Sequence, residues 1–244
     1  DWCRLISEKI NKPTIILTPL AVAEQFMREA EKFGIKANHI RDNKDVINGI
    51  NITNYEILHK IDCRQFVGVA LDESSILKQF DAKYRTTIID TFSKTPYRLS
   101  ASATPAPNDY MELGNQSQFL GVLSYHEMLA TFFVHDSGQT QKWRLKKHAE
   151  DEFWKWMCGW AVNIRKPSNI GFDDTGYNLP PLNQHLEVIE TMEENDGKLT
   201  LSMAKKVRRQ TVEMKVDKVV EIVNRDDSNE PILNRCGINA ETKT

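Results

Sequence analysis

The sequence has few cysteines, and their spacing does not suggest a metal cluster or a disulfide framework. The four cysteines lie far apart and include no CxxC pair: Cys3, Cys63, Cys158 and Cys236. A zinc ribbon and a disulfide-stapled fold are therefore not expected. Three histidines share one stretch, but their separations fit no common metal-binding motif: His126, His135 and His148. We expect a reduced, intracellular protein without metal ligation by these histidines.

Long apolar runs and an excess of one charge are also missing. No uninterrupted apolar run approaches the roughly 18 to 20 residues that span a bilayer, so a membrane role is not expected. The 32 Lys and Arg nearly balance the 34 Asp and Glu, and the net charge is −2. Any surface for phosphates must therefore come from local patterning. Two groups of positive charge could be solvated faces or part of a nucleic-acid track: Lys142, Arg144, Lys146 and Lys147, and Lys205, Lys206, Arg208 and Arg209.

Short β-branched runs alternate with helical patterns through the first hundred residues. Strands are predicted at 14–18, 50–53, 67–71 and 97–102, and helices in the opening ten residues, at 20–34 with Gly34 as the C-cap, and at 82–93. This alternation favours an α/β fold with a mostly parallel sheet and helices on both faces. Because the chain starts at Asp1 with a helical pattern, we expect an N-terminally truncated fragment.

From about residue 110 the pattern changes to longer helical stretches. We expect a helical insertion at about 110–165 within a first domain spanning 1–175. In this insertion Phe153, Trp156, Met157 and Trp160 recur on one helix face, which favours a core over a base-stacking platform and leaves Trp154 off that face. Residues 176–244 are predicted to hold a linker, a strand at 182–191, one or two helices at 198–225 and a strand at 231–237. They would form the unfinished start of a second α/β unit.

Polar clusters follow each strand of the predicted sheet. They are Thr18-Pro19, Thr53-Asn54-Tyr55-Glu56, Asp72-Glu73-Ser74-Ser75 and Ser102-Ala103-Thr104-Pro105. The carboxyl ends of parallel strands meet at one edge of a sheet, so we expect the clusters to gather there. Three clusters have a plain alternative: a strand end for the one at Thr18 and the one at Asp72, and an ordinary turn for the one at Ser102.

The adjacent acids Asp72 and Glu73 suit phosphoryl transfer better than glycoside hydrolysis. Neighbouring strand residues point to opposite faces, whereas two glycosidase carboxylates must converge on one bond. In phosphoryl transfer one acid holds Mg²⁺ and its neighbour orients the attacking water.

In order and spacing, "TPL", "TNYE", "LDES" and "SASATPAPND" resemble the motifs of superfamily-two helicases and translocases, near the DEAD/DEAH-box and Swi/Snf-type ATPases and especially phage-encoded ones. The resemblance covers residues 14–109, and residues 163–182 and 231–242 are similar to the family's passage into its second lobe. It implies a RecA-like lobe and the start of another.

The resemblance also implies roles for residues. Asp72 would hold the Mg²⁺ of Mg-ATP through water, and Glu73 would activate the attacking water. Ser102, Ala103 and Thr104 would couple the nucleotide site to the nucleic-acid track. Thr18, Pro19, Thr53 and Asn54 would contact the nucleic-acid backbone.

The sequence departs from the family in lacking the Gly-rich phosphate loop with its lysine and the late arginines. Tight binding of ATP and Mg²⁺ would need that loop, so we expect this fragment to be inactive alone. The complete protein would be an ATP-dependent helicase or translocase, cytoplasmic and encoded by a bacterium or phage, with DNA rather than RNA as its expected partner. The oligomeric state is left open.

Two other functions compete with this one. The first is a non-catalytic module of the same fold that binds nucleic acid or docks a protein. The second is a metal-dependent nuclease built on the acid pair, for which Asp90 and Asp109 are the nearby further carboxylates.

Overall fold

The structure is a computed structural model that describes residues 1–78, 82–106, 108–135, 143–189, 201–225 and 232. The chain divides into two compact units, Asp1–Ile164 and Arg165–Thr244. In the part of the chain that the structure describes, no helix is long and apolar enough to cross a bilayer.

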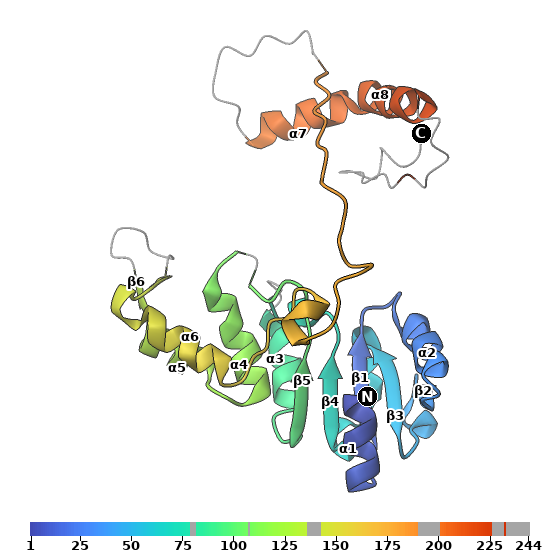
Figure 1. The fold of residues 1–244 in the computed structure, drawn as a ribbon, viewed down its shortest axis with the longest axis vertical. Helices are drawn as coiled ribbons and strands as arrows, with labels where there is room; N and C mark the ends of the chain where they lie inside the picture. The colour runs from blue at the N-terminus through green and yellow to red at the C-terminus, as the bar shows by residue number, and fades with distance from the viewer. Residues whose placement is uncertain (79–81, 107, 136–142, 190–200, 226–231, 233–244) are drawn as a thin grey trace. The chain divides into compact units, whose positions relative to one another are not determined.

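Unit 1 is built on a five-stranded parallel sheet with the order β2-β3-β1-β4-β5. Its strands are β1 (Thr14–Thr18), β2 (Ala37–His39), β3 (Ile50–Asn54), β4 (Gly68–Leu71) and β5 (Tyr97–Ser100). The predicted α/β class and the four predicted strands are confirmed, and the strand arrows point the same way in Figure 1. The three-residue edge strand β2 was not predicted, because it is too short to show an alternating pattern.

Helices cover both faces of the sheet because successive strand residues point to opposite sides. On one face, α1 (Trp2–Ile10) and α2 (Ala23–Lys32) pack on strand residues such as Ile52 and Ala70. Helix α1 crosses the front of the sheet in Figure 1. Helix α2 ends at Lys32 with Phe33 as its C-cap, so the predicted cap Gly34 lies one residue further on, in the left-handed conformation with a φ of +64°.

The other face holds the larger core. Ile15, Leu17, Val69 and Leu71 point to this side, where α3 (Ala82–Thr91) and α4 (Leu113–Leu120) pack on them together with residues of the 3₁₀ turns after β3 and β4. The sheet is thus the middle layer of three. Both sides of its central strands are closed to solvent, which explains their nearly continuous apolar sequence.

After β5 the chain forms the insertion, which has its own core. It contains α4, α5 (Tyr125–Phe132), the antiparallel pair β6 (Phe133–His135) and β7 (Trp143–Leu145), and α6 (Glu150–Cys158). Phe153 is fully buried at the centre of this core, with Trp156 and Met157 beside it and Trp160 against Trp156. The predicted core face of this segment is confirmed, and Trp154 is exposed as expected. The β6–β7 hairpin was not predicted, and its presence means that the segment predicted as a helical insertion is not purely helical.

Unit 2 has a 3₁₀ turn at Pro167–Ile170 and two helices, α7 (Leu201–Gln210) and α8 (Val212–Arg225). The strand predicted at 182–191 is wrong for residues 182–189, which form no strand. Within the described residues no strand of this unit lies beside them, and Leu186 is 89% exposed. Apart from Ile232, the strand predicted at 231–237 lies outside the described residues. The second RecA-like sheet therefore stays a prediction.

Candidate functional site

The strand register brings the four polar clusters to one edge of the sheet. Thr18 is paired with Asn54 across β1 and β3, and Leu17 with Leu71 across β1 and β4. The ladder continues past the strands, where the Asp72 N–H donates to the Leu17 carbonyl and the Ala101 N–H to the Leu71 carbonyl, both at 2.9 Å. The acid pair consequently sits between the end of β1 and the residues that follow β5. We call this edge the carboxyl rim.

Glu73 has an unusual backbone conformation at the centre of the carboxyl rim. Its φ is +48°, in the left-handed region that costs an L-residue about 1–2 kcal/mol. This turn directs the exposed Glu73 side chain towards the end of the neighbouring strand, where its Oε1 accepts a hydrogen bond from Ser102 Oγ at 3.2 Å. Ser102 Oγ in turn accepts from the Thr104 N–H at 3.1 Å. The acid pair and the Ser102-Ala103-Thr104 cluster are therefore joined directly.

Asp72 is held from the other side by Tyr55. The Tyr55 hydroxyl donates to the Asp72 carbonyl at 2.8 Å, and the Tyr55 side chain is only 2% exposed. Burial raises the pKa of the Asp72 carboxyl, against a hydrogen bond from the Glu73 backbone, and the Glu73 charge raises it further. Burial also raises the pKa of the Tyr55 hydroxyl, with Asp72, Tyr84 and Glu73 adding to the rise. Tyr55 follows Asn54 directly, so its place in the "TNYE" cluster was a signal for this role.

Gln116 of α4 connects the insertion to the acid turn. Its Nε2 donates to the Ser74 carbonyl at 3.1 Å, and its Oε1 accepts a short hydrogen bond from Ser100 Oγ. The Ser74 N–H donates to the Ala101 carbonyl at 2.8 Å. Gln116 is buried, so its amide satisfies polar groups that water does not reach. No sequence pattern pointed to this residue, since it lies 42 positions from Ser74.

The four residues predicted to contact nucleic acid lie together, but three of their side chains face inward. Thr18, Thr53 and Asn54 are buried. Thr53 Oγ1 donates to the Ile40 carbonyl at 2.8 Å, and Asn54 Nδ2 donates to the Pro19 carbonyl at 3.0 Å. Asn54 therefore shapes the loop between β1 and α2, whose Leu20 is exposed, whereas Thr53 ties β3 to the residue after β2. Contact of this loop with a polynucleotide stays a prediction.

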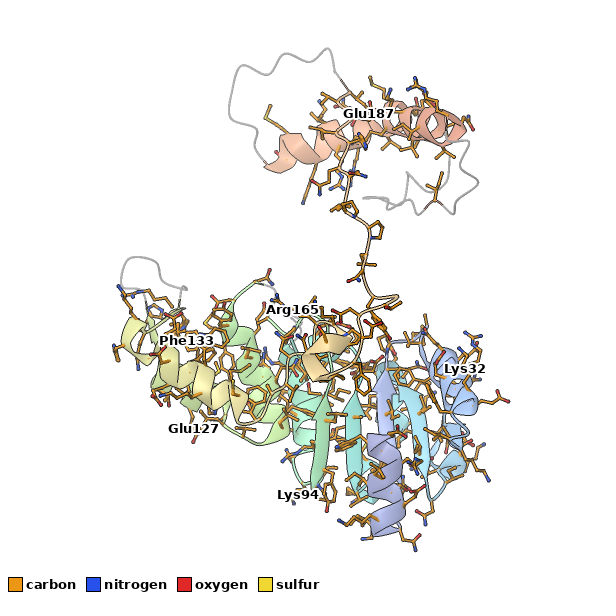
Figure 2. The ribbon with its side chains drawn as sticks, in the orientation of Figure 1. Lys32, Lys94, Glu127, Phe133, Arg165 and Glu187 are labelled. Atoms are coloured by element: carbon orange, nitrogen blue, oxygen red, sulfur yellow. The ribbon has the colours of Figure 1, made fainter. Side chains whose placement is uncertain are left out.

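Two open cavities lie at the opposite end of the sheet from the acid pair. One, of about 780 Å³, includes Asn11 and Gly49 in its lining, and the other, of about 560 Å³, includes Asp90 and Lys94. Figure 2 labels Lys94 at this amino end of the strands. Cavity size alone does not mark the site here, because the convergent polar chemistry is at the carboxyl rim. Asp90 is consequently far from the acid pair, which weakens the nuclease hypothesis.

The other nuclease candidate, Asp109, has a local structural role. Its Oδ1 accepts from the Met111 N–H at 3.0 Å and caps the short turn before α4. Within the described ranges no group of three His, Cys, Asp or Glu side chains could hold a metal ion. An acid pair alone still fits Mg²⁺, which is commonly bound by one or two carboxylates together with substrate phosphates. Asp72, which is half-buried at the carboxyl rim, offers one such carboxylate.

Comparisons with known proteins give little beyond this geometry. No model of a known protein family matches the sequence, and no curated protein matches it. Among solved structures, the chain is similar to the SWI2/SNF2 ATPase core of Sulfolobus solfataricus in complex with dsDNA, with 23% identity and a TM-score of 0.43. The match covers 52% of this chain and 30% of that chain. A likeness this weak carries no functional argument, so a function for this chain must be inferred from the carboxyl rim and the ordered motifs.

Proposed function

We propose that this chain belongs to the motor core of an ATP-dependent helicase or translocase that acts on nucleic acid, with DNA as the expected track. One observation carries the proposal: Glu73 adopts a costly left-handed backbone, and its carboxylate is hydrogen-bonded to Ser102. Backbone strain of this kind persists where the surrounding structure enforces it and is typical of functional sites. The motif resemblance in residues 14–109 supports the same assignment.

Each residue of the carboxyl rim has a part in this proposal. Asp72 would hold Mg²⁺ through water, and the metal, when bound with ATP, would supply positive charge to the phosphate oxygens. Glu73 would orient the attacking water and accept its proton. Tyr55 holds the Asp72 backbone, which fixes the start of the acid turn. A movement of Glu73 would make or break its hydrogen bond with Ser102 and so shift the segment that follows β5. A hydroxyl suits this role because it can exchange hydrogen-bond partners at low steric cost.

The test uses the full-length gene product and measures phosphate release from ATP with and without DNA. Glu73→Gln keeps the side-chain shape but removes the base, so turnover should fall by about 10²- to 10⁴-fold. Nucleotide binding should remain. Glu8→Gln is the matched control, because Glu8 lines the cavity at the opposite end of the sheet. If Glu73→Gln hydrolyses ATP as fast as the unmodified protein does, the assignment is wrong.

A non-catalytic module of the same fold is the second candidate. The 244 residues contain no Gly-Lys-Ser or Gly-Lys-Thr sequence to cradle phosphates, which favours it for this chain taken alone. This candidate predicts DNA binding that does not change with ATP. A binding titration of the full-length gene product with and without nucleotide separates the two, since a motor changes its affinity for the track through the ATPase cycle.

A further inference from the structure

Helix α7 carries a concentrated positive charge. Its ten residues, LSMAKKVRRQ, contain no acid, and four exposed cations occupy little more than one turn: Lys205, Lys206, Arg208 and Arg209. At about 100° per residue these side chains cover an arc of about 160°. Val207 and Thr211 lie on the opposite side and are at least half-buried. The cations thus form one continuous surface, which we call the α7 cationic arc.

The described residues supply no acid that neutralises this arc. On α8, by contrast, Lys218 pairs with Glu187 and Glu221, and Arg225 pairs with Glu221. No ion pair involves the α7 cations among the residues that the structure describes. Like charges three or four residues apart on a helix repel one another, as Lys205 does with Arg208 and Arg209, so the arrangement costs stability unless a polyanion compensates it. Helices α7 and α8 follow each other along the chain, with Thr211 between them (Figure 1).

The other basic group of the sequence has a structural use. Lys146 Nζ donates to the carbonyls of Ala130 and Thr131 at 2.8 and 2.9 Å. These carbonyls belong to the last turn of α5, where a cation satisfies unpaired acceptors and the helix dipole. In the other group Lys146 is thus engaged, whereas none of the four cations of the α7 cationic arc has such a partner among the described residues.

We propose that the α7 cationic arc binds the phosphate backbone of nucleic acid, as a contact surface separate from the carboxyl rim. Lys205 and Arg209 are four residues apart and so about 6 Å apart along the helix axis. Phosphates of one B-DNA strand follow each other every 3.4 Å or so of duplex axis, so one turn of α7 matches about two phosphates. Such contacts carry no base information, which suits binding without sequence preference. The proposal needs no ATP hydrolysis and goes beyond the function proposed above.

The test measures binding of the full-length gene product to a mixed-sequence duplex DNA by fluorescence anisotropy, without nucleotide, from 50 to 200 mM salt. The double variant K205Q/R209Q removes two cations and keeps good helix formers. The matched control K218Q/R225Q removes the same charge from paired positions on α8. Circular dichroism checks that both variants keep their helices.

If the arc binds two phosphates through these side chains, K205Q/R209Q flattens the slope of log K against log salt by about 1.8. If the plots for the variant and the unmodified protein meet at 1 M salt, this change in slope corresponds to a loss of about 60-fold in affinity at 0.1 M salt. The control should change the slope by much less. Equal changes in both variants would mean a general charge effect and would overturn the proposal, as would stronger binding to phosphatidylserine vesicles than to DNA. Because this titration contains no nucleotide, failure of the ATPase proposal is seen separately, in the phosphate-release assay.

Discussion

Replacing Tyr55 by phenylalanine tests whether the acid turn is held by the hydrogen bond from the residue that follows β3. The Tyr55 hydroxyl donates to the Asp72 carbonyl at 2.8 Å from a side chain that is buried in the main core. Phenylalanine fills the same space but leaves the carbonyl without this donor. The loss of a typical hydrogen bond costs about 0.5–1.5 kcal/mol. We therefore expect Tyr55→Phe to lower the free energy of unfolding of unit 1 by that amount.

Tyr84 on α3 provides a matched control in the same core. Its hydroxyl is buried and has no hydrogen-bond partner among the described residues. Burial raises the pKa of this hydroxyl, and the Glu56 charge adds to the rise. Removing a buried hydroxyl without a partner removes a desolvation cost, so Tyr84→Phe should leave stability unchanged or raise it. Both substitutions remove a tyrosine hydroxyl, but only Tyr55→Phe is expected to lower the free energy of unfolding.

Urea denaturation followed by tryptophan fluorescence is a suitable assay. All five tryptophans lie between residues 2 and 160, so the signal reports on unit 1. For a unit of this size about 1 kcal/mol corresponds to a shift of about 2–4 °C in the midpoint of a thermal scan, which serves as a second measurement. An equal loss of stability in both variants, or a loss in Tyr84→Phe alone, would refute the assignment of the Tyr55 hydrogen bond.

Three further predictions concern the acid turn and the thiols. Because Glu73 has a positive φ, Glu73→Gly should be more stable than Glu73→Ala by about 1 kcal/mol in urea denaturation; equal midpoints would contradict the strain. The raised pKa of Asp72 means that the folded state binds its proton more tightly, so wild-type stability falls as pH rises through that pKa. Asp72→Asn should therefore gain stability relative to wild type as the pH rises above 3.8, the ordinary pKa of this carboxyl, and a difference that is independent of pH would exclude this. Burial raises the pKa of Cys3 and of Cys63 to about 12, whereas Cys158 is exposed. A thiol reagent at pH 8 should label Cys158 in the native protein, and peptide mapping that finds Cys3 or Cys63 labelled equally fast would count against the burial.

The amino-acid sequence alone determined the parts of this protein that depend on local pattern. Apolar runs ended by polar clusters located β1, β3 and β4, because a strand buried on both faces has little choice of residue type. The edge strand β5 was predicted as well, although its residues are exposed or half-buried. The spacing of Phe153, Trp156 and Met157 identified the buried face of α6, because the helical backbone itself sets the period at which side chains return to one face. The order of the polar clusters along the chain, together with parallel pairing, was sufficient to predict one carboxyl rim.

Only the tertiary structure decided which side chains meet on that rim. The bonds from Tyr55 to Asp72 and from Gln116 to Ser74 join residues 17 and 42 positions apart, and periodicity does not encode such distances. The left-handed backbone of Glu73 is also a tertiary result, because no glycine marks it and the neighbouring strands must enforce it. Residues 182–189 show the reverse case: their pattern favours a strand, but a strand needs a neighbour to satisfy its backbone, and the described part of unit 2 has none to offer.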